Sequence, residues 1–159
     1  IKYVIKKKYK IVMVTNQTSV SKGLISFAKM KKTNDILVQK INTFVGQKVF
    51  DGIFICPYHP DASIKQYRFD SEDRKPKPGM FLKAKEKLSL NLEKSIMVGD
   101  RVSDIVAGNL AGCCTILKVN KFSNLKMIKS NLIYSRKMET PDYRVTNLLE
   151  IIPIMEEII

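Results

Sequence analysis

Short apolar runs alternate with longer segments of helical pattern in this chain, and this alternation restricts the folds open to it. We expect strands near residues 10–14, 51–56, 95–99, 114–119 and 143–145. Helices are expected near 26–48, 79–88, 102–111 and 146–158, with Pro153 bending or interrupting the last one, and the least organised segment runs from Asn120 to Thr140. Because the strand runs are apolar throughout, both faces of the sheet need cover. The pattern therefore predicts an α/β fold, a three-layer sandwich around a mostly parallel sheet.

Composition limits the class of protein. With 159 residues, of which 45% are hydrophobic, the chain suits one domain with a single core. The net charge of +13 would suit a nucleic acid or the steering of a small phosphorylated substrate. The lysines are scattered over several helices without interleaved aromatic residues, so we expect no nucleic-acid partner. Three unpaired cysteines and the lack of a secretory or membrane-spanning run favour a cytoplasmic protein with no membrane partner.

Polar residues follow two of the expected strands, and two cations precede a helix. Thr15 follows the first strand together with two amides, which can hydrogen-bond phosphoryl oxygens, and Asp100 follows the run 95–99. Arg74 and Lys75 lie in a loop stiffened by neighbouring prolines. The carboxyl ends of parallel strands gather ligands, and a carboxylate there suits magnesium. Taken singly, Asp100 could equally be a cap or turn residue, but together the three signals predict a phosphate and magnesium site.

In combination these motifs resemble the haloacid dehalogenase (HAD) superfamily, and most closely its branch of D,D-heptose 1,7-bisphosphate phosphatases and histidinol phosphatases. The stretches that carry the resemblance are Val14–Gln17 with Lys22-Gly23, Phe50–Pro60, Arg74–Met80, Met97–Asp104, Ala107-Gly108, Ala111–Cys113 and Pro141–Val145. The resemblance implies a HAD-like, Rossmann-like fold and a monomer.

The resemblance also implies a role for each matching residue. Thr15 and Lys75 would stabilise the transferring phosphoryl group, and Asp100 would bind Mg²⁺. Asp104, one helical turn later, would orient Asp100 or cap the helix instead of binding metal. Five further side chains would contact the substrate: Asn16, Gln17, Thr18, Arg74 and Arg101.

The nucleophile of the family is missing from this sequence. The family attacks phosphorus with the first Asp of an Asp-x-Asp-Gly-Thr motif, which does not occur here, so we expect the chain alone to be inactive or nearly so. Residues 1–8 read as the end of an amphipathic helix, which suggests that 1–159 is one N-terminally truncated domain lacking about 30 or more residues, one βα unit. The missing strand would lie between the strand ending at Thr15 and the one ending at Asp100, and its loss would leave two half-sheets.

Some members of this branch hold zinc through a Cys-x-His pair and a Cys-x-Cys pair. Here only Cys56 is present, and His59 falls one residue late. The other three positions hold Tyr58, Ser71 and Asp73. Since a structural zinc site needs four nitrogen or sulfur ligands, we expect no zinc. The loop 57–73 would then be mobile unless Tyr67 and Phe69 pack down.

These inferences favour a magnesium-dependent phosphatase of a small phosphorylated sugar. The resemblance implies D-glycero-D-manno-heptose 1,7-bisphosphate as the substrate, on the way to lipopolysaccharide precursors, and an aspartyl-phosphate intermediate whose nucleophile lies outside this chain. Two alternatives stay open. One is a catalytically dead phosphate-binding or regulatory remnant. The other is a polynucleotide 3'-phosphatase-like domain, which shares the Thr-Asn-Gln, Arg-Lys-Pro and Gly-Asp motifs but matches less well at 56–60 and 100–104.

Overall fold

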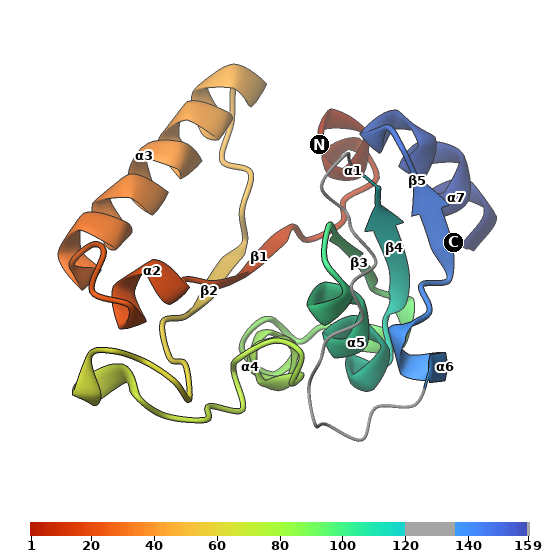
Figure 1. Ribbon diagram of the computed structural model, residues 1–159. Coiled ribbons are helices and arrows are strands. Elements are labelled where there is room, and N and C mark those ends of the chain that lie inside the picture. Colours follow the sequence, from red (N-terminus) through yellow and green to blue (C-terminus); the bar gives the residue numbers. More distant parts are fainter. Residues whose placement is uncertain (120–135, 159) are drawn as a thin grey trace. The chain divides into compact units, whose positions relative to one another are not determined.

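The computed structural model describes residues 1–119 and 136–158, and Figure 1 shows their helices and strands. The chain divides into two compact units, Ile1–Arg74 and Lys75–Ile159. Each unit contains its own small parallel sheet with helices. None of the described helices combines the length and the apolar character needed to cross a membrane.

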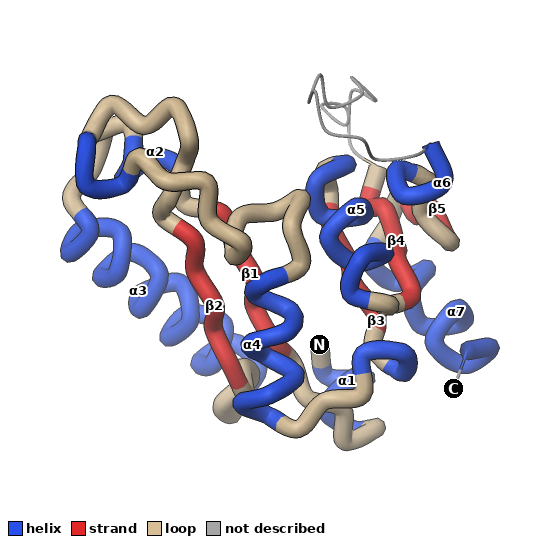
Figure 2. Tube along the Cα trace, turned by 90° about the horizontal axis from the view of Figure 1, so that it is seen from below, coloured by secondary structure: helices blue, strands red, loops and turns tan. Residues whose placement is uncertain are grey.

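The first unit is built on two parallel strands. Its elements are α1 (Lys2–Lys6), β1 (Val12–Asn16), α2 (Thr18–Ser21), α3 (Phe27–Val45), β2 (Gly52–Cys56) and the 3₁₀ turn η1 (Lys65–Tyr67). Val12 pairs with Gly52 and Asn16 with Cys56, and Figure 2 shows the two strands running side by side. The crossover helix α3 begins where the Ser26 hydroxyl accepts the Lys29 N–H. It ends at Gly46, whose φ of +87° is readily adopted only by glycine.

The second unit is built on three parallel strands in the order β3-β4-β5. Its elements are α4 (Gly79–Leu88), η2 (Leu92–Lys94), β3 (Ile96–Gly99), α5 (Val102–Ala111), β4 (Cys114–Lys118), α6 (Arg136–Glu139), β5 (Tyr143–Val145), η3 (Leu148–Glu150) and α7 (Ile151–Ile158). Helix α5 packs on β3 and β4, and Ile105, Val106 and Ile116 are fully buried there. Gly108 permits this close approach, because a Cβ at that position would lie 2.7 Å from Thr115 Cγ2.

The parallel α/β class is confirmed, and all five predicted strands are present. Among the described residues the strands form two sheets, one of β1 and β2 and one in the order β3-β4-β5. That a further strand completes one sheet in one domain stays a prediction.

Several boundaries differ from those predicted. The first strand runs two residues later than expected, so Thr15 and Asn16 lie inside β1 instead of after it. The predicted helix at 146–158 is divided into η3 and α7, and Pro153 falls in the first turn of α7, where its missing N–H breaks no helical bond. The short helices α2 and α6 were not predicted. Of the stretch Asn120–Thr140, residues 120–135 lie outside the described residues.

Candidate functional site

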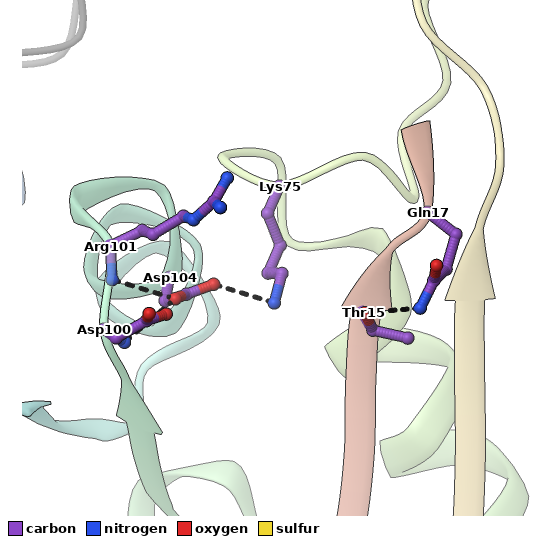
Figure 3. A network of polar contacts seen from close by, with 6 residues as sticks. All are labelled: Thr15, Gln17, Lys75, Asp100, Arg101 and Asp104. Carbon is purple, nitrogen blue, oxygen red and sulfur yellow. Dashed lines mark hydrogen bonds and ion pairs between the residues drawn. The ribbon is translucent and has the colours of Figure 1, made fainter. Parts of the chain in front are cut away.

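One carboxylate organises the polar residues of the second unit. Asp104 Oδ1 lies 2.7 Å from the Lys75 ammonium. Asp104 Oδ2 accepts the backbone N–H of Asp100 at 3.2 Å and that of Arg101 at 3.1 Å. Figure 3 shows the carboxylate between the lysine and the start of α5. Asp104 therefore caps the helix, as predicted, and ties Lys75 to the turn that carries Asp100.

This arrangement depends on burial and on one glycine. Lys75 and Asp104 are only 8% and 6% exposed, so their attraction is weakly screened by solvent. Gly99 ends β3 directly beneath the cap, where an added Cβ would lie 2.3 Å from Asp104 Cβ. Only glycine leaves room for the Asp104 side chain to fold back over the strand end. Sequence reasoning did not assign this role to Gly99, although the Gly-Asp pair was visible.

Asp100 and Arg101 follow β3 and are both exposed. Asp100 thus presents a carboxylate at the carboxyl end of a parallel strand, as expected for a ligand-binding position. Among the described residues, no group of three or more His, Cys, Asp or Glu side chains could hold a metal ion. A magnesium site needs fewer protein ligands than such a group would supply, because Mg²⁺ keeps several bound waters and needs only one or two carboxylates besides a phosphate. Asp100 fits that requirement, whereas both Asp104 oxygens already have partners.

The predicted residues of the first unit gather where β1 ends. Thr15 and Asn16 are the last two residues of β1, and Thr18 begins α2. Gln17 Nε2 donates to Thr15 Oγ1 at 3.4 Å, and the Gln17 N–H donates to Cys56 O at 2.8 Å, which continues the β1–β2 pairing by one residue. All four side chains are half-buried. This end of β1 therefore offers a hydroxyl and two amides, groups that hydrogen-bond phosphoryl oxygens.

Arg74 is the last residue of the first unit. Its Nη1 donates to the Tyr58 carbonyl at 3.1 Å, and burial lowers the pKa of the guanidinium below its usual range. The rings of Tyr67 and Phe69 both contact Tyr58, while Phe69 is exposed. That the loop 57–73 is mobile stays a prediction. Cys56 is buried, and desolvation raises the pKa of its thiol.

The comparisons with known proteins agree with this geometry. A family model described as HAD-hydrolase-like matches residues 73–151. A D-glycero-beta-D-manno-heptose-1,7-bisphosphate 7-phosphatase of Photorhabdus laumondii is 32% identical over 142 residues, which cover 86% of this chain and 73% of that protein. The chain belongs to the HAD-like phosphatases. The resemblance expected from its motifs is thereby confirmed.

A second relative is also similar in sequence to this HAD-like chain. A D-glycero-beta-D-manno-heptose-1,7-bisphosphate 7-phosphatase of Vibrio cholerae is 39% identical over 113 residues. That match covers 70% of this chain, and the chain spans 59% of the relative's length.

Two solved structures of HAD-like phosphatases have similar folds. A putative HAD-like phosphatase from Mesorhizobium loti has a TM-score of 0.65 at 29% identity, covering 72% of this chain and 54% of that one. The D,D-heptose 1,7-bisphosphate phosphatase of B. bronchiseptica, solved with magnesium and phosphate, has a TM-score of 0.63 at 28% identity, covering 74% and 60%.

Proposed function

We propose that this chain is part of a magnesium-dependent phosphatase that removes one phosphate from a small phosphorylated sugar, D-glycero-D-manno-heptose 1,7-bisphosphate in particular, on the way to lipopolysaccharide precursors. One observation carries the proposal: Asp104 joins Lys75 to the strand end that presents Asp100. A fixed cation beside an exposed carboxylate suits a phosphate and a divalent cation. The names of the relatives and the magnesium and phosphate in one similar structure support this substrate class.

Each residue would act through its own chemistry. Lys75 would neutralise charge on the phosphoryl oxygens, and the Thr15 hydroxyl would donate to one of them. Asp100 would hold Mg²⁺, which when bound neutralises phosphate charge. Five side chains would contact the rest of the substrate: Asn16, Gln17, Thr18, Arg74 and Arg101.

The nucleophile is not among the 159 residues. No Asp-x-Asp pair occurs in the sequence, and an aspartyl-phosphate cannot form without a carboxylate in line with the leaving group. We propose that a segment outside this sequence supplies it. The chain itself would bind the phosphate, hold the cation and keep the substrate in one orientation. We further propose that it works in the cytoplasm as a monomer, without zinc, nucleic acid or membrane partners.

A chimera tests this function. The segment of the Vibrio cholerae relative that precedes the matched region is fused before Ile1, and phosphate release from D-glycero-D-manno-heptose 1,7-bisphosphate is measured with Mg²⁺. Lys75→Ala and Asp100→Asn should each abolish most turnover, while Lys94→Ala, at an exposed lysine of the same unit, should not. Full activity in either site variant would refute the assignment.

A second function is favoured by the missing aspartate pair: a phosphate-binding or regulatory protein without chemistry. Calorimetry on the chain as given, with Mg²⁺ and inorganic phosphate, would show binding in both cases. Turnover in the chimera separates the phosphatase from the binding protein, because a protein that only binds phosphate stays inactive when the missing segment is supplied. A 3'-phosphorylated oligonucleotide serves as the third substrate, and turnover of it in preference to the sugar would favour the polynucleotide 3'-phosphatase alternative.

A further inference from the structure

The segment between β2 and Lys75, residues 57–74, contains only the turn η1 and folds back on itself. The His59 N–H donates to Tyr67 O at 3.1 Å, which joins the outgoing arm to the returning arm. Arg68 Nε donates to Ala62 O at 2.8 Å, and Ala62 is only 2% exposed. Backbone and side-chain bonds thus close the segment at two places.

Aromatic rings join the same two arms. Tyr58 lies on the outgoing arm, and its ring meets Tyr67 at a centroid distance of 6.2 Å with a tilt of 53°. Phe69, on the returning arm, meets the Tyr58 ring edge-on at 6.0 Å and 82°. Both distances fall within the range of attractive ring pairs, and the edge-on arrangement places a ring edge against a ring face. We call these three residues the ring cluster.

The ring cluster is connected directly to Arg74. The Tyr58 carbonyl accepts the bond from Arg74 Nη1 at 3.1 Å, and the Arg74 N–H donates to Ser71 O at 3.0 Å. Ser71 is 5% exposed, so the backbone of Arg74 is anchored in the interior of the unit. The guanidinium is therefore directed at the Tyr58 backbone, and the side chain of the same residue packs against the two other rings.

We propose that the ring cluster positions Arg74, and so sets the affinity of this site for a phosphorylated sugar. The inference rests on the proposed function, in which Arg74 contacts the substrate. Tyr58, Tyr67 and Phe69 are positioning residues: they order the segment before the ligand arrives, and this lowers the entropy cost that binding would otherwise include.

Phe69→Ala tests the inference without endangering the fold, because Phe69 is 60% exposed. Solvent exchange of the Arg74 guanidinium protons, followed by NMR in the full chain, should become about 3- to 10-fold faster when the edge-on ring is removed. Phe44→Ala is the matched control: Phe44 is 86% exposed and has no ring contact among the described residues. Phe69→Tyr keeps the ring and should restore slow exchange.

Ligand affinity is the second measurement. Calorimetry with D-glycero-D-manno-heptose 1,7-bisphosphate and Mg²⁺ should show Phe69→Ala binding weaker by the same factor of about 3 to 10. In the active chimera, KM should rise while kcat stays unchanged. Unchanged Arg74 exchange overturns the inference, and so does faster exchange with unaltered affinity. If the wild-type chain binds no sugar bisphosphate, the proposed function fails, and the Arg74 exchange alone then decides whether the ring cluster positions this side chain.

Discussion

Replacing Asp104 by Asn is the most informative single change in this protein. Asn keeps the size of the side chain and an oxygen that can still accept the N–H groups of Asp100 and Arg101. It removes the charge facing the Lys75 ammonium at 2.7 Å. The variant therefore separates the ion pair from the helix cap. Asp104→Ala removes both.

The expected size follows from burial. The side chains of the pair are 9% and 8% exposed, and breaking a buried ion pair by removing one partner costs about 3–5 kcal/mol. Because Asn retains the cap, we expect Asp104→Asn to lose about 3 kcal/mol of unfolding free energy in the second unit. The loss of the cap in Asp104→Ala should add about 1 kcal/mol. Lys75→Met combined with Asp104→Asn should lose less than the sum of the single changes, with a coupling energy of about 2 kcal/mol.

Native-state hydrogen exchange of the Ile116 and Leu117 amides measures this free energy, since both residues lie in β4 at the core of the second unit. Glu93→Gln, an exposed acid in η2, is the control and should change the exchange by less than about 0.5 kcal/mol. A coupling energy near zero would show that the ion pair adds nothing to the free energy of unfolding, and the reasoning from burial would then be wrong.

Three further changes have definite expected results. Gly99→Ala should displace Asp104, because the added Cβ would lie 2.3 Å from Asp104 Cβ; we expect a loss of about 1–3 kcal/mol of unfolding free energy and weaker phosphate binding in calorimetry. Gly46→Ala is the control, since nothing lies within 4 Å of the added Cβ: it should cost only the backbone strain of φ +87° and leave binding unchanged. Burial raises the pKa of the Cys113 thiol from 9.0 to about 11, so the thiol ionises first in the unfolded chain, and the free energy of unfolding should fall by about 2–3 kcal/mol between pH 9 and pH 11. Denaturant melts of Cys113→Ala should lack that loss, and an equal loss in the variant would contradict the assignment. Asp142→Ala removes the carboxylate that accepts from the backbone N–H and hydroxyl of a buried threonine in β4, and thermal melting should show a loss of about 2 kcal/mol, whereas Asp142→Asn should lose less.

Most of the fold was accessible to sequence reasoning because the strands are short, apolar and separated by helices of ordinary length. The boundaries were less accessible. The extension of β1 through Asn16 depends on its pairing with Cys56, a contact made across distant parts of the chain. Helix α2 has four residues and no side-chain cap, so no local signal announces it. The division before α7 reflects the proline, whose effect was predicted but whose place in the first turn was not.

The candidate site was predicted in its residue types, and its connections came from the structure. Motif spacing singled out Lys75, Asp100 and Asp104, and the capping role of Asp104 followed from its place one turn into a helix. The ion pair between Lys75 and Asp104 joins residues far apart in the sequence, and no local pattern encodes it. The bond from Arg74 to the Tyr58 carbonyl is equally invisible, because any residue at position 58 offers the same backbone oxygen.

The position of Asp104 restricts how this protein can change. The Asp104 carboxylate caps helix α5 and also forms the ion pair with Lys75. A substitution that replaces it by another capping residue therefore removes the partner of Lys75. A residue that pairs better with the lysine would in turn leave two backbone N–H groups without their acceptor. Proteins commonly gain stability by relaxing a functional site. In this protein one carboxylate provides both the helix cap and the ion pair, so we expect engineered variants to gain stability only at positions away from it.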